Sequence, residues 1–126
     1  MERLTQAVYV LVGVAGVVLG TLAVFAPALV IPEAGQIPLA GHLIREQGAG
    51  FVFIGLMSFW CLRHFELRDP VHYAFLVFTG LLAGIHWMGY FGSGYYMWAA
   101  VVNSVPFLAF AVTVPIGAAD HPSRQR

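Results

Sequence analysis

The feature that most constrains this chain is a long apolar run near its start, from Ala7 to Ile31. Its only polar interruptions are the hydroxyls of Tyr9 and Thr21, which helices tolerate. Because about 20 apolar residues in a helix cross a hydrocarbon core of roughly 30 Å, this run is long enough to span a membrane. A cleavable signal peptide is the competing interpretation, since residues 26–28 have small side chains at the right spacing. The apolar stretch before them is longer than a signal peptide usually has.

The composition agrees with a membrane protein and excludes several other classes. Of the 126 residues, 60% are hydrophobic and only 10% are charged, whereas soluble domains are about one quarter charged. Six arginines balance six acidic residues, so a basic nucleic-acid surface is excluded. Cys61 is the one cysteine, which excludes a disulfide framework and a cysteine-based metal cage within one chain.

The second apolar run reaches the length of a membrane span only together with the residues before it. It extends from Gly48 to Leu62, and at 15 residues it is too short to cross a bilayer alone. Because no proline occurs between Pro38 and Pro70, a helix can begin near Leu39 and make up the length. We therefore predict an all-α fold, an integral membrane four-helix bundle formed by a single domain (residues 1–126). Its spans are expected at residues 7–31, 39–63, 71–91 and 95–116.

The arginines predict the orientation of this bundle. Four spans place both termini on one side, and five of the six arginines fall on that side, with Arg45 alone on the other. By the positive-inside rule both termini are cytoplasmic, in a multi-pass protein of a bacterial inner membrane. An aromatic belt is then expected at the outer surface, formed by Trp87, Tyr90, Phe91, Tyr95, Tyr96 and Trp98.

The first span also carries a small-xxx-small pair, Gly16 and Gly20. Such a pair lets a neighbouring membrane helix approach closely. Glycine as ordinary filler of a membrane helix is the alternative.

Three polar residues enter the outer third of the second span. Glu46 lies 17 residues before Arg63, or about 25 Å along a helix, which is just inside the hydrocarbon edge. His42 precedes Glu46 by four residues, so its imidazole can share that carboxylate, and Arg45 flanks the same sector. Because an isolated charge at such depth is costly, we expect the three side chains to form one polar cluster that faces inward.

The third and fourth spans carry polar side chains that could meet this cluster. His72, Thr79, His86 and Ser93 recur every seven residues and share one helix face. His86 is expected at nearly the depth of Glu46 on an antiparallel neighbour, so the two side chains can meet, with Tyr90 beside them. On the fourth span Asn103 lies ahead of Pro106, where it either mends the interrupted backbone or contacts a ligand. The whole network could equally serve only to hold helices together.

The same residues argue against other chemistries. His42 and His86 are expected at unequal depths, which disfavours a haem ligated by both imidazoles. No metal site is predicted. No serine–histidine–acid spacing and no phosphate loop appears in the sequence, which favours a role other than catalysis.

The layout resembles that of small bacterial four-helix membrane proteins of the DoxX-like group. The resemblance rests on the apolar first helix ending in proline, on residues 45–50 opening the second helix, on an arginine-rich inner loop and on residues 84–86 late in the third. Some members are linked to electron transfer from thiosulfate to quinone as small membrane subunits, so the resemblance implies a quinone-facing role. Glu46 and His86 are the residues that it carries over.

Together these observations predict a protein that binds an amphiphilic molecule, a quinone or a lipid, in an outward-facing cavity. The cavity would be lined by His42, Arg45, Glu46, His86, Tyr90 and Asn103. One alternative is an accessory subunit that packs against membrane-protein partners or against copies of itself. Another is a small proton-coupled transporter, although the first helix carries no membrane carboxylate of the kind that small exporters use.

Overall fold

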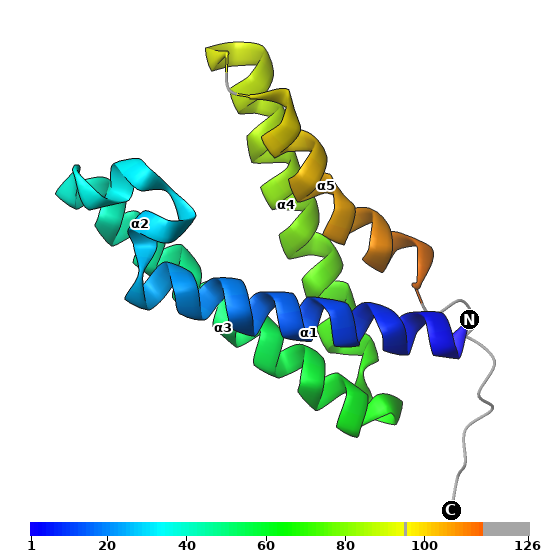
Figure 1. Cartoon of the computed structure of the whole chain (residues 1–126). Coiled ribbons are helices and arrows are strands. Elements are labelled where there is room, and N and C mark those ends of the chain that lie inside the picture. Colours follow the sequence, from blue (N-terminus) through cyan, green and yellow to red (C-terminus); the bar gives the residue numbers. More distant parts are fainter. Residues whose placement is uncertain (95, 115–126) are drawn as a thin grey trace, which may run out of the picture. The chain divides into compact units, whose positions relative to one another are not determined.

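The computed structural model describes residues 1–94 and 96–114, and every regular element within them is helical. The chain divides into two compact units, Met1–Val71 and the residues from His72 onward. Figure 1 shows the helices of both units, which are described separately below. The expectation of an all-α fold is therefore confirmed for the described residues.

The first unit is built on two long antiparallel helices, α1 (Glu2–Phe25) and α3 (Pro38–Arg63). The single turn α2 (Pro27–Val30) and the 3-10 turn η1 (Pro32–Gly35) connect them, and the 3-10 turn η2 (Phe65–Leu67) follows α3. The sequence predicted one helix through Ile31, but α1 ends at Phe25, and Ala26 has φ −138° and ψ 57°. Pro27 explains the break, because it lacks an N–H and disfavours the helical conformation of the preceding residue.

Glycines hold α1 and α3 in close backbone contact. A β-carbon placed on Gly20 would lie 2.6 Å from the carbonyl oxygen of Gly48, and one on Gly16 would lie 2.7 Å from that of Phe51. From the other side, a β-carbon on Gly55 would lie 2.7 Å from the backbone nitrogen of Val17. Larger residues would therefore force the helices apart. The small-xxx-small pair of the first span is a packing surface rather than filler.

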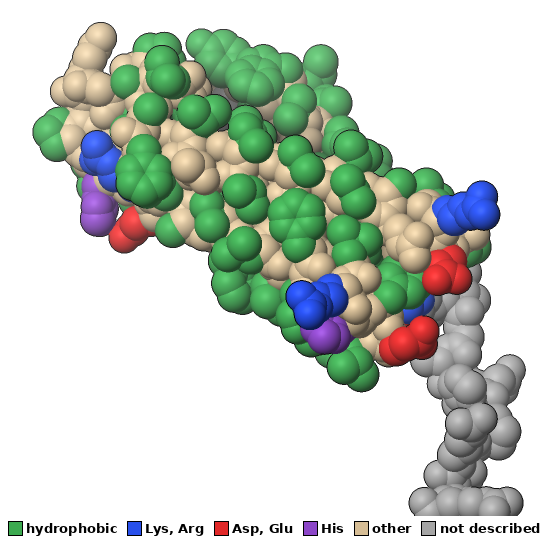
Figure 2. Space-filling model, turned by 60° about the horizontal axis from the view of Figure 1, so that its bottom comes forward, with side chains coloured by type: hydrophobic (Ala, Val, Ile, Leu, Met, Phe, Trp, Pro, Cys, Tyr) green, Lys and Arg blue, Asp and Glu red, His purple; other side chains and the backbone are tan. Residues whose placement is uncertain are grey.

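Large apolar side chains cover the outside of this helix pair. The buried positions are mostly small residues, whereas Leu11 is 69% exposed and Phe25 is 82% exposed. On α1 the large exposed apolar side chains are Leu4, Val10, Leu11, Val14, Val18, Leu19, Leu22 and Phe25. On the face drawn in Figure 2, the charged and histidine side chains lie in separate groups, and hydrophobic side chains cover the surface between them. Polar ends around an apolar middle are typical of a membrane-spanning pair.

The second unit consists mainly of two antiparallel helices, α4 (Asp69–Ser93, from His72 onward) and α5 (Met97–Val112). They are joined through side chains at several levels. His72 Nε2 lies 3.0 Å from the Phe110 carbonyl oxygen, and Trp87 Nε1 donates to Ser104 Oγ at 3.0 Å. The expected spans 39–63 and 71–91 agree with α3 and α4 to within two residues, whereas α5 is shorter than the expected 95–116. Residues 95, 115 and 116 lie outside the described part of the chain.

Two of the helices within the described residues are long and apolar enough to cross a membrane, α1 and α4. α5 is apolar but shorter. α3 has the length, but its first three turns carry the polar residues His42, Arg45, Glu46 and Gln47. Among the long helices, α3 therefore has the least support as a membrane span, because it carries these polar and charged residues.

Candidate functional site

The polar cluster of the first unit lies in the first turns of α3. This helix begins at Pro38, whose fixed φ suits the first helical position, and it follows the extended residue Ile37. Four residues apart on one helix face, His42 and Glu46 approach each other, with 3.2 Å between Nε2 and Oε1. The predicted sharing of the Glu46 carboxylate by His42 is present in the structure.

Arg45 does not join this pair. Among the described residues it makes no ion pair, although it is adjacent to Glu46 in sequence. Its guanidinium lies near Gly41, where Nη1 would be 3.7 Å from an added β-carbon. Arg45 is exposed, and so are His42 and Glu46, whose side chains are 67% and 62% exposed. The pair thus lies on the surface of the first unit, and the predicted inward direction of this cluster in the bundle stays a prediction.

His86 and Tyr90 lie four residues apart near the end of α4, in the second unit, and both are half-buried. His86 Nδ1 is 2.8 Å from the carbonyl oxygen of Leu82 on the same helix. Tyr90 packs edge-on against Trp87, with ring centroids 5.9 Å apart. The expected meeting of His86 with Glu46 would join the two units, and it stays a prediction.

Asn103 and Ser104 lie on α5 just before Pro106, which interrupts the helix ladder. The Asn103 amide donates to the carbonyl of Ala99 at 2.8 Å, and the Ser104 hydroxyl donates to that of Ala100 at 2.8 Å. Each side chain therefore bonds to the carbonyl four residues back, a common arrangement in membrane helices. Pro106 lacks the N–H that would bond to the carbonyl of Val102, and Asn103 bonds to Ala99 instead, so the predicted mending of the backbone by Asn103 is wrong.

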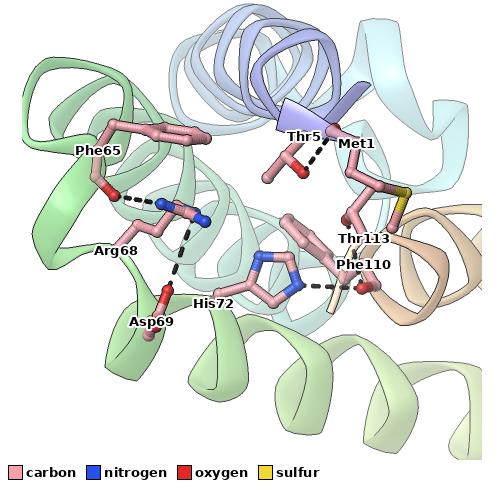
Figure 3. A network of polar contacts seen from close by, with 8 residues as sticks. All are labelled: Met1, Thr5, Phe65, Arg68, Asp69, His72, Phe110 and Thr113. Carbon is pink, nitrogen blue, oxygen red and sulfur yellow. Dashed lines mark hydrogen bonds and ion pairs between the residues drawn. The ribbon is translucent and has the colours of Figure 1, made fainter. Parts of the chain in front are cut away.

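The seven-residue stripe of α4 is buried at its beginning and exposed at its end. His72 is fully buried, and Thr79 is buried with its hydroxyl bonded to the carbonyl of Phe75 at 2.7 Å. His86 is half-buried, while Ser93 is exposed. The shared face is therefore buried at its first two positions. The hydrogen bond of His72 to the Phe110 carbonyl allows the complete burial of its imidazole (Figure 3).

Two sets of polar contacts in the first unit were not predicted from the sequence. Tyr9 and Cys61 are fully buried and lie next to each other between α1 and α3. Arg68 folds over Phe65, with its Cζ 3.8 Å from the ring centroid and Nη1 donating to the Phe65 carbonyl at 2.7 Å. Figure 3 shows this arginine also reaching toward Asp69, with 3.8 Å between Nε and Oδ1. Arg68 had been counted only as a loop charge, and no sequence pattern signals these contacts.

The described residues offer no metal centre, since no three histidine, cysteine or acidic side chains among them come close enough to hold an ion. The candidate residues themselves offer hydrogen bonding and charge. In the first unit this chemistry is the Arg45 guanidinium beside the His42–Glu46 pair. In the second unit it is the His86 imidazole, four residues before Tyr90 on the same helix.

A comparison with known families matches 86 of the 126 residues, from 4 to 89, to a domain of unknown function, DUF4345. The chain belongs to this family. The matched region extends from α1 into the last turns of α4, so it includes Arg45, Glu46 and His86 but ends before Tyr90. No curated protein and no solved structure matches the chain. The resemblance to the DoxX-like group is a separate expectation that the family match does not address.

Proposed function

We propose that this chain is a multi-pass protein of a bacterial inner membrane that binds an amphiphilic molecule, a quinone or a lipid. The polar head of the ligand would lie at the outer end of α3, beside Arg45. The observation that carries the proposal is the state of this arginine. It is exposed and makes no ion pair among the described residues, while the neighbouring Glu46 is engaged by His42 at 3.2 Å.

The surface of the helix pair supports a membrane location. Exposed leucine, valine and phenylalanine side chains extend along α1, while glycines occupy its contact with α3. A water-soluble protein would place these residues the other way round. Because α1 packs so closely against α3, removal of α1 as a signal peptide would expose the glycine face of α3. We therefore retain α1 as a membrane span, with the N-terminus cytoplasmic.

Arg45 has the chemistry to hold an amphiphile head at that surface. A guanidinium offers five N–H donors in a planar fork and suits carbonyl, carboxylate and phosphate oxygens. On a lipid-facing helix an unpaired guanidinium near the hydrocarbon edge is unfavourable in free energy, so binding of an anionic or carbonyl head would stabilise it. The exposed Leu39 and Leu43 nearby would contact the apolar part of such a ligand.

The test is a measurement of the lipids and quinones that co-purify with the protein. The full chain is extracted in mild detergent, and its bound lipophiles are quantified by mass spectrometry. Arg45→Gln and Glu46→Gln should lower the bound amphiphile several-fold without unfolding the protein, which circular dichroism would verify. Arg63→Gln, at the opposite end of the same helix, is the matched control and should change nothing. Equal lipophile content in all four proteins would refute the proposal.

One observation favours a second candidate, an accessory subunit of a membrane complex. The glycines of α1 pack against α3 within the first unit. On α4, by contrast, an added β-carbon at Gly84 would have no atom within 4 Å. A partner helix could approach closely there. In mild detergent such a subunit would migrate with partner proteins, and Gly84→Leu would release it. Migration of the native protein as a single species would exclude this role.

A further inference from the structure

The tautomer of His86 is determined by its own helix. A carbonyl oxygen can only accept a hydrogen bond, so the 2.8 Å contact with Leu82 requires that Nδ1 of His86 carries a proton. In the neutral imidazole, Nε2 then has a lone pair and no proton. Within the described part of the chain nothing donates a hydrogen bond to this nitrogen, and the ring is only half-buried. His86 therefore presents an open acceptor.

Three aromatic rings lie within the next turn and a half of α4. Trp87 and Phe91 are nearly parallel, at an interplanar angle of 24° and a centroid distance of 5.7 Å. Tyr90 stands edge-on to Phe91 at 5.0 Å, and it shares the helix face of His86. The hydrogen bond from Trp87 to Ser104 on α5 holds the indole in place. Tyr90, one turn beyond His86 on the same helix face, thus joins this face to a preordered group of flat apolar surfaces.

We propose that this end of α4 binds the hydroxyl-bearing head of an amphiphile. The ligand O–H donates to Nε2 of His86, and its carbon framework packs on the group formed by Trp87, Tyr90 and Phe91. Hydroxyl heads of this kind occur on reduced quinones and on phosphatidylglycerol. The inference rests on the proposed function only in assuming that the protein takes an amphiphile. It concerns a site in the second unit, separate from Arg45, and it adds that the head bound there must be a hydrogen-bond donor.

The consequence is a preference for one redox form of a quinone. A quinol carries two O–H groups and can donate to Nε2. Its oxidised form carries only carbonyl oxygens, which cannot satisfy a lone pair and would lose their own bonds to water. Both forms have nearly the same size and the same apolar tail, so stacking on the three rings cannot separate them. Discrimination would come from the single hydrogen bond at His86.

The experiment uses the full-length protein in detergent at pH 8, with Trp60→Phe and Trp98→Phe so that Trp87 alone reports binding. Three short-chain probes are titrated without oxygen, namely a benzoquinol, its oxidised quinone and the dimethyl ether of the quinol. The quinol should bind about five-fold more tightly than either of the others, as expected for one neutral hydrogen bond. His86→Phe should abolish the difference. His64→Phe, in the loop after α3, is the matched control and should retain it.

A second measurement does not depend on a variant. In protein labelled with ¹⁵N-histidine, the resonance of the unprotonated His86 nitrogen should move when the quinol is added and remain in place with the dimethyl ether. Competition between vesicle lipids then identifies the source of the hydroxyl. Displacement of the quinol by phosphatidylglycerol, but not by phosphatidylcholine, would support the proposal with a lipid head as the ligand.

Three outcomes would overturn the proposed hydrogen bond between the ligand hydroxyl and His86. Equal affinity for the three probes would remove the hydrogen-bond requirement but leave an amphiphile-binding protein. A quinol preference that survives in His86→Phe would place the discrimination elsewhere. Absence of binding by all three probes, together with unchanged lipophile content in Arg45→Gln, would remove both this inference and the proposed function.

Discussion

Replacing Gly20 by alanine should separate α1 from α3 and destabilise the first unit. The added β-carbon would lie 2.6 Å from the Gly48 carbonyl oxygen and 2.7 Å from the backbone nitrogen of Val52. Ordinary contact begins at 3.4 Å, so the closer approach is too short by 0.8 Å (3.4 minus 2.6). Because the obstructing atoms belong to the backbone of α3, no side-chain rotation can relieve the clash.

The magnitude follows from two opposing effects. Over-packing typically costs about 1–3 kcal/mol, and a clash with backbone atoms belongs to the upper part of that range. Alanine is a better helix former than glycine by about 1 kcal/mol, which offsets part of the cost. The net expected loss in the free energy of unfolding is therefore about 1–2 kcal/mol. Gly16→Ala should behave similarly, since its β-carbon would lie 2.7 Å from the Phe51 carbonyl oxygen.

Unfolding can be followed by circular dichroism in mild detergent micelles as the fraction of sodium dodecyl sulfate is raised. Gly50→Ala is the control, because it lies on α3 but an added β-carbon there would have nothing within 4 Å. This variant should be as stable as the original protein or more stable. If Gly20→Ala unfolds at the same detergent fraction as Gly50→Ala, the close packing of α1 on α3 is not what stabilises the unit.

Three further predictions concern buried and half-buried polar groups. His72→Leu should lower stability in the same titration by about 1–2 kcal/mol, because it removes the hydrogen bond to a carbonyl of α5, and unchanged stability would contradict that role. Trp87→Phe and Ser104→Ala should be coupled by about 0.6 kcal/mol in a double-mutant cycle, whereas strict additivity would mean that their hydrogen bond contributes nothing. Cys61 should react slowly with a maleimide until the protein is unfolded, because it is fully buried. The variant Gln36→Cys, at an exposed position and in a Cys61→Ser background, should react at once. Equal reaction rates of this variant and of folded protein with Cys61 would refute the burial of Cys61.

Much of the helical layout could be predicted from local patterns. The extents of α3 and α4 follow from apolar length and from the prolines near their ends, since these features act within a few residues of the boundary. The break at Ala26 follows from the same principle, because Pro27 disfavours a helical conformation of the residue before it. The continuous apolar run instead predicted one helix through Ile31.

The candidate site divides in the same way. The pairing of His42 with Glu46 was predictable because four residues bring two side chains together on any helix. That Arg45 makes no ion pair, and that His86 bonds to its own helix through Nδ1, depend on rotamers and on the groups nearby. Residue spacing alone contains neither piece of information.

By itself, the sequence determined that the chain is helical, that it is apolar enough for a membrane, and which side chains can share a helix face. These properties depend on composition and on the geometry of one helix. Only the tertiary structure decided that the glycines of α1 meet the backbone of α3, and that the polar side chain of His72 is completely buried. The reason is physical, since a close contact or a long-range hydrogen bond exists only when two distant segments meet in one register.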